Sequence, residues 1–106
     1  SMGSQRNSNM NDTVVRFATL EGKSPHTYWL PYDKPWDMDL ELIDNCITVK
    51  NIDVNGPGFQ CGIRNDDIIN GLGNTTFNVD TNVPKAVEIL KQCKIASKPV
   101  KVFILR

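Results

Sequence analysis

The sequence has few of the residues that metal, disulfide-rich and membrane proteins depend on. Its 106 residues include three cysteines and one histidine, His26. The cysteines are far apart and form no C-x-x-C pair, so we expect neither a disulfide framework nor a zinc site. No apolar run approaches the ~18 residues that cross a bilayer. We therefore predict no metal, no cofactor and no transmembrane segment.

An excess of charge of either sign is also missing. Lys plus Arg number 12, as do Asp plus Glu. This balance gives no reason to expect nucleic-acid binding. The single histidine has no recognisable nucleophile beside it, so we predict that the chain is not an enzyme. Free thiols and the absence of an export signal favour a cytoplasmic setting, where partners could hold the chain at the inner membrane surface.

The length fits one domain that buries its own core and is expected to be monomeric. Residues 1–12 are polar and rich in Asn and Ser, which indicates a tag remnant or a disordered segment. Residues 13–26 are interpreted as an N-terminal extension, in which Thr13 to Leu20 has the composition of a strand. Residues 27–106 are predicted to form the folded domain.

Apolar and polar residues alternate from Met38 to Ile43, which predicts a half-buried strand. The turn signal Asp44-Asn45 and a second strand from Ile47 to Ile52 then suggest a hairpin. Further short strands are expected at Thr27 to Tyr32, at Ile68-Ile69 and at Val100 to Leu105.

One long helix is predicted between Asn82 and Lys94, where apolar residues recur with helical spacing. Thr81 or Asn82 can cap its start, and Pro84 is tolerated in a first turn. A single helical turn is expected near Phe59. These elements predict a mainly β fold of the α+β class with about five or six strands and two helices, one short and one long.

The central part of the chain resembles a PDZ domain. Gly56-Pro57-Gly58 stands where that family has a Ser-Pro-Ala or Gly-Pro-Ala corner, and Cys61-Gly62-Ile63 matches its small-Gly-aliphatic step. Asp66-Asp67-Ile68-Ile69 matches the family's Gly-Asp-Ile-Ile, with Asp66 in place of glycine. The long helix and the closing strand follow in the family's order. The resemblance covers roughly residues 27–106 and implies a partly open, five- to six-stranded barrel or sandwich.

The resemblance also implies a function, which is peptide binding by strand addition between the strand from Met38 and the helix from Val83. Pro35-Trp36-Asp37-Met38 is the best candidate for the family's carboxylate-binding loop X-Φ-Gly-Φ. Gly71-Leu72-Gly73 is interpreted as a decoy, because it follows a buried strand. The backbone N–H groups of Asp37, Met38 and Asp39 are then expected to hold the ligand's terminal carboxylate. The side chains expected to line the pocket for the last ligand residue are those of Met38, Leu40, Val87 and Leu90.

Two features of this implied site bear on its ligand. Val83 occupies the first helix position, which in the family selects the residue two before the ligand's end, so an apolar residue is predicted there. The carboxylate of Asp37 would repel a terminal carboxylate. Either its side chain points to solvent, or internal peptide segments are preferred over C-terminal ones.

Two other functions stay open at the level of sequence. The chain could be a substrate-sensing regulatory domain of a larger enzyme such as a protease. It could also be a structural domain in which the segment Thr13 to Leu20 pairs with the groove strand and closes the groove.

Overall fold

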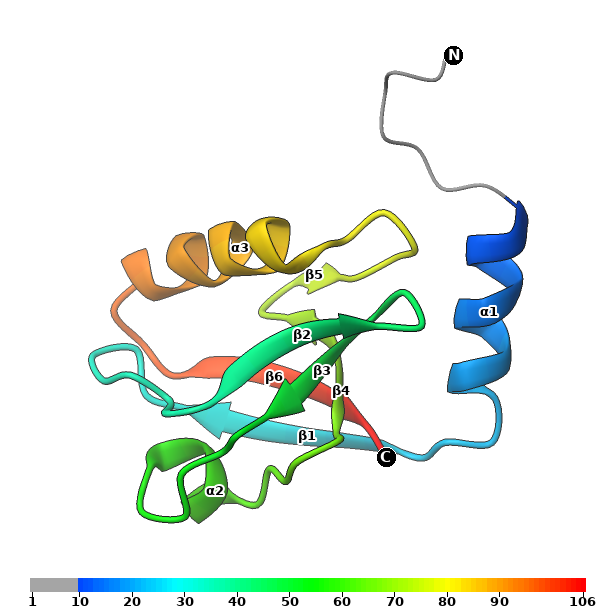
Figure 1. Ribbon diagram of the computed structural model, residues 1–106. Helices are drawn as coiled ribbons and strands as arrows, with labels where there is room; N and C mark the ends of the chain where they lie inside the picture. The colour runs from blue at the N-terminus through cyan, green and yellow to red at the C-terminus, as the bar shows by residue number, and fades with distance from the viewer. Residues whose placement is uncertain (1–9) are drawn as a thin grey trace.

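The computed structural model describes residues 10–106 and places six strands in one antiparallel sheet (Figure 1). The strand order is β1-β6-β4-β3-β2, with β5 beside β4. The strands are β1 (Pro25–Leu30), β2 (Asp39–Ile43), β3 (Cys46–Lys50), β4 (Ile68–Leu72), β5 (Thr75–Thr76) and β6 (Val100–Leu105). Because β1 and β2 stand at opposite ends of this order, the sheet stays open. The predicted α+β architecture is confirmed.

Two of the helices are those predicted, α2 (Pro57–Cys61) and α3 (Val83–Ile95). Asn82 caps α3, since its side-chain oxygen accepts a hydrogen bond of 3.0 Å from the backbone N–H of Lys85. In Figure 1, α3 runs alongside β2 on one side of the sheet, and α2 lies near β1 at the other. The sheet is therefore capped by one short and one long helix.

A third helix corrects the expectation for the N-terminal extension. Residues Met10–Leu20 form helix α1, so Thr13 to Leu20 is not a strand, and residues 10–106 contain three helices. Met10 to Asp12, predicted to be tag or disordered, belong to this helix, whereas residues 1–9 lie outside the described part of the chain. The β-branched pair Val14-Val15 suggested a strand because β-branched residues favour strands by local propensity. Tertiary contacts of α1 override that propensity.

Arg16 makes the contacts that attach α1 to the sheet. Its guanidinium donates hydrogen bonds to the carbonyl of Asn45 at 2.8 Å, to Oδ1 of Asn70 at 2.6 Å and to the carbonyl of Phe77 at 3.4 Å. The residue is only 8% exposed. A charged donor buried in this way needs its acceptors, so α1 is held in one position against the β2–β3 turn, β4 and the segment after β5.

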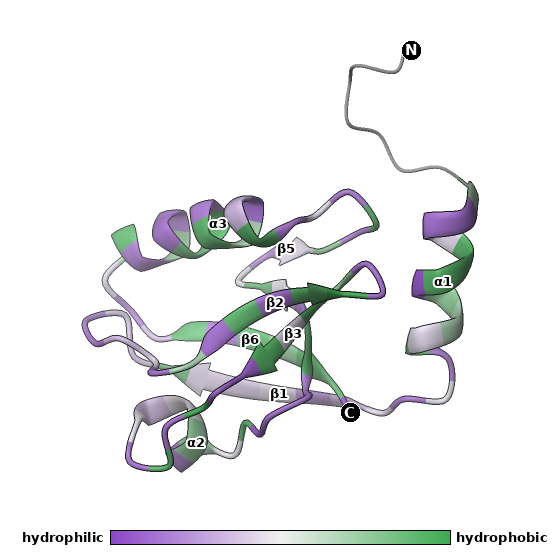
Figure 2. Ribbon diagram, in the orientation of Figure 1, coloured by the Kyte–Doolittle hydropathy of each residue, from purple (hydrophilic) through white to green (hydrophobic). Residues whose placement is uncertain are grey.

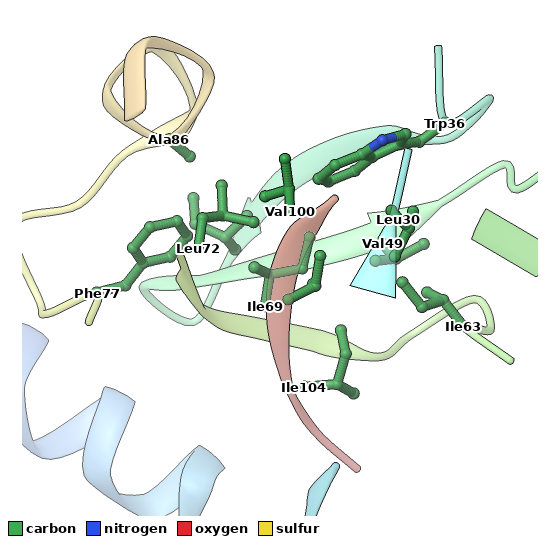
Figure 3. Packing of buried hydrophobic residues seen from close by; sticks show 12 residues of the cluster. Leu30, Trp36, Val49, Ile63, Ile69, Leu72, Phe77, Ala86, Val100 and Ile104 are labelled. Carbon is green, nitrogen blue, oxygen red and sulfur yellow. The ribbon is translucent and has the colours of Figure 1, made fainter. Parts of the chain in front are cut away.

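The hydrophobic core lies inside the bent sheet, between β3, β4 and β6 and beneath α3 (Figure 3). Ile69, Leu72, Val102 and Ile104 are almost completely buried there. Figure 2 shows β4 and β6 coloured mainly as hydrophobic, whereas the outward side of α3 is hydrophilic. Ala86 is the fully buried residue of α3, and its small side chain lets the helix approach the core.

The β2–β3 hairpin has the register that its alternating pattern requires. Leu40 faces Val49, and the turn residues Asp44 and Asn45 have φ values of 52° and 61°. Two successive positive φ angles are typical of a type I′ turn, which Asp and Asn tolerate well. The predicted turn is confirmed, and β2 is fixed as the strand at the end of the sheet.

We predict that Arg16→Ala lowers the free energy of unfolding by about 2–3 kcal/mol, because it removes a charged donor and leaves three acceptors without it. Chemical denaturation followed by circular dichroism measures this change. Val14→Ala is the matched control, since Val14 is 57% exposed on the same helix and should change stability by less than about 0.5 kcal/mol. Equal effects of the two substitutions would contradict the anchoring role of Arg16.

Candidate binding groove

A groove of about 250 Å³ runs between β2 and α3. It includes every residue predicted for the site except Asp37, and it adds Lys94. Its lining residues are Trp36, Met38, Asp39, Leu40, Val83, Val87, Leu90 and Lys94. The residues span the loop before β2, the strand itself and the whole length of α3. The structure therefore brings together side chains that are more than forty positions apart in the sequence.

One wall of the groove is the free edge of β2. Within residues 10–106, β2 pairs only with β3, so the backbone groups on its other edge face the space below α3. An unpaired strand edge is a template for pairing with another extended chain. Leu40 is half-buried at this edge, on the same face of β2 as Met38.

The other wall is one face of α3. Val83, Val87, Leu90 and Lys94 follow one another at intervals of four, three and four residues, which places them on one side of a helix. Lys94 was not among the residues predicted for the site, because the sequence indicated it only as the end of the long helix. Its helical spacing from Leu90 is the signal that could have placed it in the groove.

Trp36 closes one end of the groove and also belongs to the core. It is 7% exposed, and its indole Nε1 donates a 2.8 Å hydrogen bond to the carbonyl of Pro31. A buried indole with a satisfied N–H is rigid. The loop before β2 is therefore tied to the core (Figure 3), because Trp36 packs in the core and lines the groove at the same time.

Asp37 occupies the loop position where the family pattern has glycine, and its backbone adopts a glycine-like conformation with φ of 59°. Its side chain does not line the groove and instead lies against Gly56, where an added Cβ would meet the Asp37 Cβ at 2.5 Å. Its carbonyl accepts a 2.9 Å hydrogen bond from the N–H of Asp53. The carboxylate is thus turned away from the groove.

The backbone N–H groups of this loop offer unused donors. Among residues 10–106, the N–H groups of Asp37 and Met38 donate to no protein acceptor. Lys94 lines the groove together with Trp36 and Met38, and its Nζ lies 3.4 Å from the carbonyl of Lys34 and 5.4 Å from the centre of the Trp36 ring. Free amides and a cation together make this end of the groove attractive to an anion.

The other polar residues singled out in the sequence have structural partners. Asp67 is almost fully buried, accepts a 2.8 Å hydrogen bond from the N–H of Arg64 and forms an ion pair with Arg106, whose pKa it raises. Asp66 has a φ of 73° and pairs with Lys50. The contacts of Asp66 and Asp67 therefore stabilise the turn before β4.

The thiols are poorly suited to nucleophilic chemistry. Burial raises the pKa of Cys46, Cys61 and Cys93, so the thiolate is scarce at neutral pH. In the described range, no three His, Cys, Asp or Glu side chains gather in a way that could hold a metal ion. Residues 10–106 also contain no helix that is long and apolar enough to cross a membrane.

The N-terminal helix does not close the groove. No residue between Met10 and His26 lines it, and α1 lies near the β2–β3 turn, away from the loop that holds Trp36 (Figure 1). The segment Thr13 to Leu20 therefore does not pair with β2, which removes the basis for the predicted self-occlusion by that segment.

Comparison with solved structures identifies the fold as that of PDZ domains. The SHANK1 PDZ domain of a choanoflagellate, solved bound to a GIRK3 peptide, matches with a TM-score of 0.65 and 18% identity, over 79% of this chain and 93% of that one. The second PDZ domain of Dlg1 from the choanoflagellate Monosiga brevicollis matches with a TM-score of 0.64 and 13% identity, over 78% of this chain and 99% of that one. No protein-family model and no curated protein sequence matches the chain.

Asp37→Gly is predicted to raise the free energy of unfolding by about 0.5 kcal/mol, because glycine adopts a positive φ without the steric cost of a Cβ. Asp37→Ala, which removes the carboxylate but keeps the Cβ, should lower stability by a similar amount. Urea denaturation of both variants gives the comparison. If alanine and glycine act alike, the backbone conformation of Asp37 is not the cause.

Proposed function

We propose that this chain is a protein-interaction module that binds the C-terminal segment of a partner protein by adding it as a strand to β2. The observation that carries the proposal is the coincidence of an unpaired strand edge, an apolar groove and free amide donors at one end of that groove. The peptide-bound SHANK1 domain supports it, because that domain shares the fold. A monomeric module in the cytoplasm is the setting we propose.

Strand addition supplies the main attraction. An extended peptide lying antiparallel to β2 would satisfy the backbone groups along its free edge. Its last side chain would enter the apolar part of the groove beside Met38, Leu40, Val87 and Leu90, and Trp36 would bound that space. Such an interface is small, so binding on the order of micromolar, or about −8 kcal/mol, is expected.

The terminal carboxylate would bind where the loop meets the end of α3. The free N–H groups of Asp37 and Met38, and that of Asp39, would donate to it, and Lys94 would neutralise it. Because the side chain of Asp37 lies against Gly56, its repulsion is reduced. This geometry favours C-terminal peptides over internal segments.

The residue two before the ligand's end would face the start of α3. Val83 is the first residue of that helix and lines the groove, and it offers no hydrogen bond to a hydroxyl group. An apolar ligand residue buries its surface there, whereas Ser or Thr would lose water without a replacement partner. We therefore propose an apolar preference at this ligand position.

A C-terminal peptide array is predicted to show apolar residues, and not Ser or Thr, two positions before the end of the best ligands. Val83→His should move that preference toward Ser and Thr by a factor of about five, since the imidazole adds one hydrogen bond to the hydroxyl. Leu40→Lys is the control for the groove and should abolish binding of every peptide. A dominant Ser or Thr preference in the unaltered chain would contradict the assignment of Val83.

Lys94→Gln is predicted to weaken binding of a peptide with a free C-terminus by about two- to fivefold, because one partly exposed ion pair is lost. The same peptide with an amidated C-terminus should bind both forms equally. Lys91→Gln is the matched control, since Lys91 is exposed on α3 and does not line the groove. Fluorescence anisotropy titration of the three proteins with the two peptides gives the six affinities. Equal losses for the acid and the amide would show that Lys94 does not contact the carboxylate.

A further inference from the structure

The rim of the groove carries two exposed carboxylates that alternate with its apolar residues. Asp39 and Glu41 lie on β2 on either side of Leu40 and are exposed. Since successive side chains of a strand point to opposite faces, Asp39 and Glu41 lie on the face of β2 opposite to Leu40. In Figure 2, hydrophilic and hydrophobic residues alternate along the ribbon of β2.

The neighbouring strand neutralises these carboxylates only in part, because Lys50 is the one cation of β3 and interacts with Glu41 at a distance while it pairs with Asp66. Glu41 is paired in register with the uncharged Thr48. Asp39 is paired in register with Lys50, but the Nζ of Lys50 lies 2.5 Å from Oδ1 of Asp66, which is the leading cause of the raised pKa of this lysine. The side chain of Asp39 accepts a 2.9 Å hydrogen bond from Nδ2 of Asn51, a neutral donor. The outer face of β2 thus keeps a negative charge.

A strand added to β2 would have the same alternation. With the ligand's end near Met38, its last residue and the residue two before it enter the groove, on the face of Leu40. The residues one and three before the end then lie on the face of Asp39 and Glu41, as cross-strand neighbours of those carboxylates. Opposite charges at such positions attract, and like charges repel.

From this register we infer that the ligands of this groove carry Lys or Arg at the residues one and three before their C-terminus, recognised by Asp39 and Glu41. The inference rests on the proposed strand addition. It extends the proposed ligand motif from apolar residues alone to apolar residues that alternate with basic ones. Lys94 completes the pattern, because it attracts the terminal carboxylate at the other side of the last ligand residue.

Three fluorescent peptides test this inference. They share their length, an apolar last residue and an apolar residue two before the end, and they carry Lys, Gln or Glu at the positions one and three before the end. Titrated against the full chain at low ionic strength, the Lys peptide should bind about fivefold more tightly than the Gln peptide, and the Glu peptide more weakly still, because each exposed ion pair contributes a factor of a few.

Variants of the rim supply the controls. The double variant Asp39→Asn with Glu41→Gln should bind the three peptides equally, and Asp39→Lys with Glu41→Lys should reverse their order. Glu21→Gln with Glu88→Gln removes the same net charge at exposed positions outside the groove and should keep the original order.

Two failures are distinguishable in this experiment. If none of the three peptides binds, or if Leu40→Lys leaves binding unchanged, strand addition itself is wrong. If all three bind with equal affinity and Leu40→Lys abolishes that binding, the groove binds peptides but the basic preference is overturned. Persistence of the Lys preference in the Asn/Gln double variant would also overturn it, because the selectivity would then come from other carboxylates.

Discussion

The groove exists because β2 has a partner on only one side. Pairing with β3 fixes the position of β2, and the contact of α3 with the core through Ala86 fixes the helix beside it. Between these two rigid elements the edge of β2 has no protein partner among residues 10–106. A free edge is a liability for most proteins, because it pairs with other chains. Here a helix stands beside the edge and restricts which chains can reach it.

The backbone conformation of one loop residue, Asp37, keeps its own carboxylate out of the groove. Asp37 holds a positive φ that is costly for a residue with a Cβ, and two contacts maintain it. Its carbonyl accepts a hydrogen bond from the N–H of Asp53. Its side chain lies against Gly56, where a Cβ would collide with it. Trp36 anchors the preceding residue in the core. Gly56, which belongs to the Gly-Pro-Gly corner, thus leaves the space that the Asp37 side chain occupies outside the groove.

The sequence allowed the hairpin, the long helix and the closing strand to be predicted, because each depends on local rules. The alternation from Met38 to Ile43, the turn at Asp44-Asn45 and the cap at Asn82 are each determined by neighbouring residues. Helix α1 could not be predicted in this way. Its position depends on Arg16 reaching acceptors on three distant segments, and such contacts leave no periodic signal.

The same distinction between local patterns and distant contacts applies to the residues of the site. Strand and helix periodicity placed Met38, Leu40, Val87 and Leu90 on the inward faces of their elements, and the resemblance to PDZ domains implied that they line a groove, so these four could be named from the sequence. The direction of the Asp37 side chain could not, because it depends on the absence of a side chain at Gly56, nineteen positions away. Lys94 was hidden for a different reason, since a lysine near a helix C-terminus already has a sufficient explanation.

The charges around the groove also determine the direction in which a peptide can lie. Lys94 and the free amides of the loop form a positive end, whereas Asp39 and Glu41 make the rim beyond it negative. A peptide with its carboxylate at Lys94 meets complementary charge along its whole length when its alternate residues are basic. The reversed peptide would place its positive N-terminus beside Lys94 and would leave its carboxylate near the acidic rim. Because charge complementarity acts on orientation and encounter more than on affinity, this arrangement would favour one direction of the proposed strand addition before any side chain is buried.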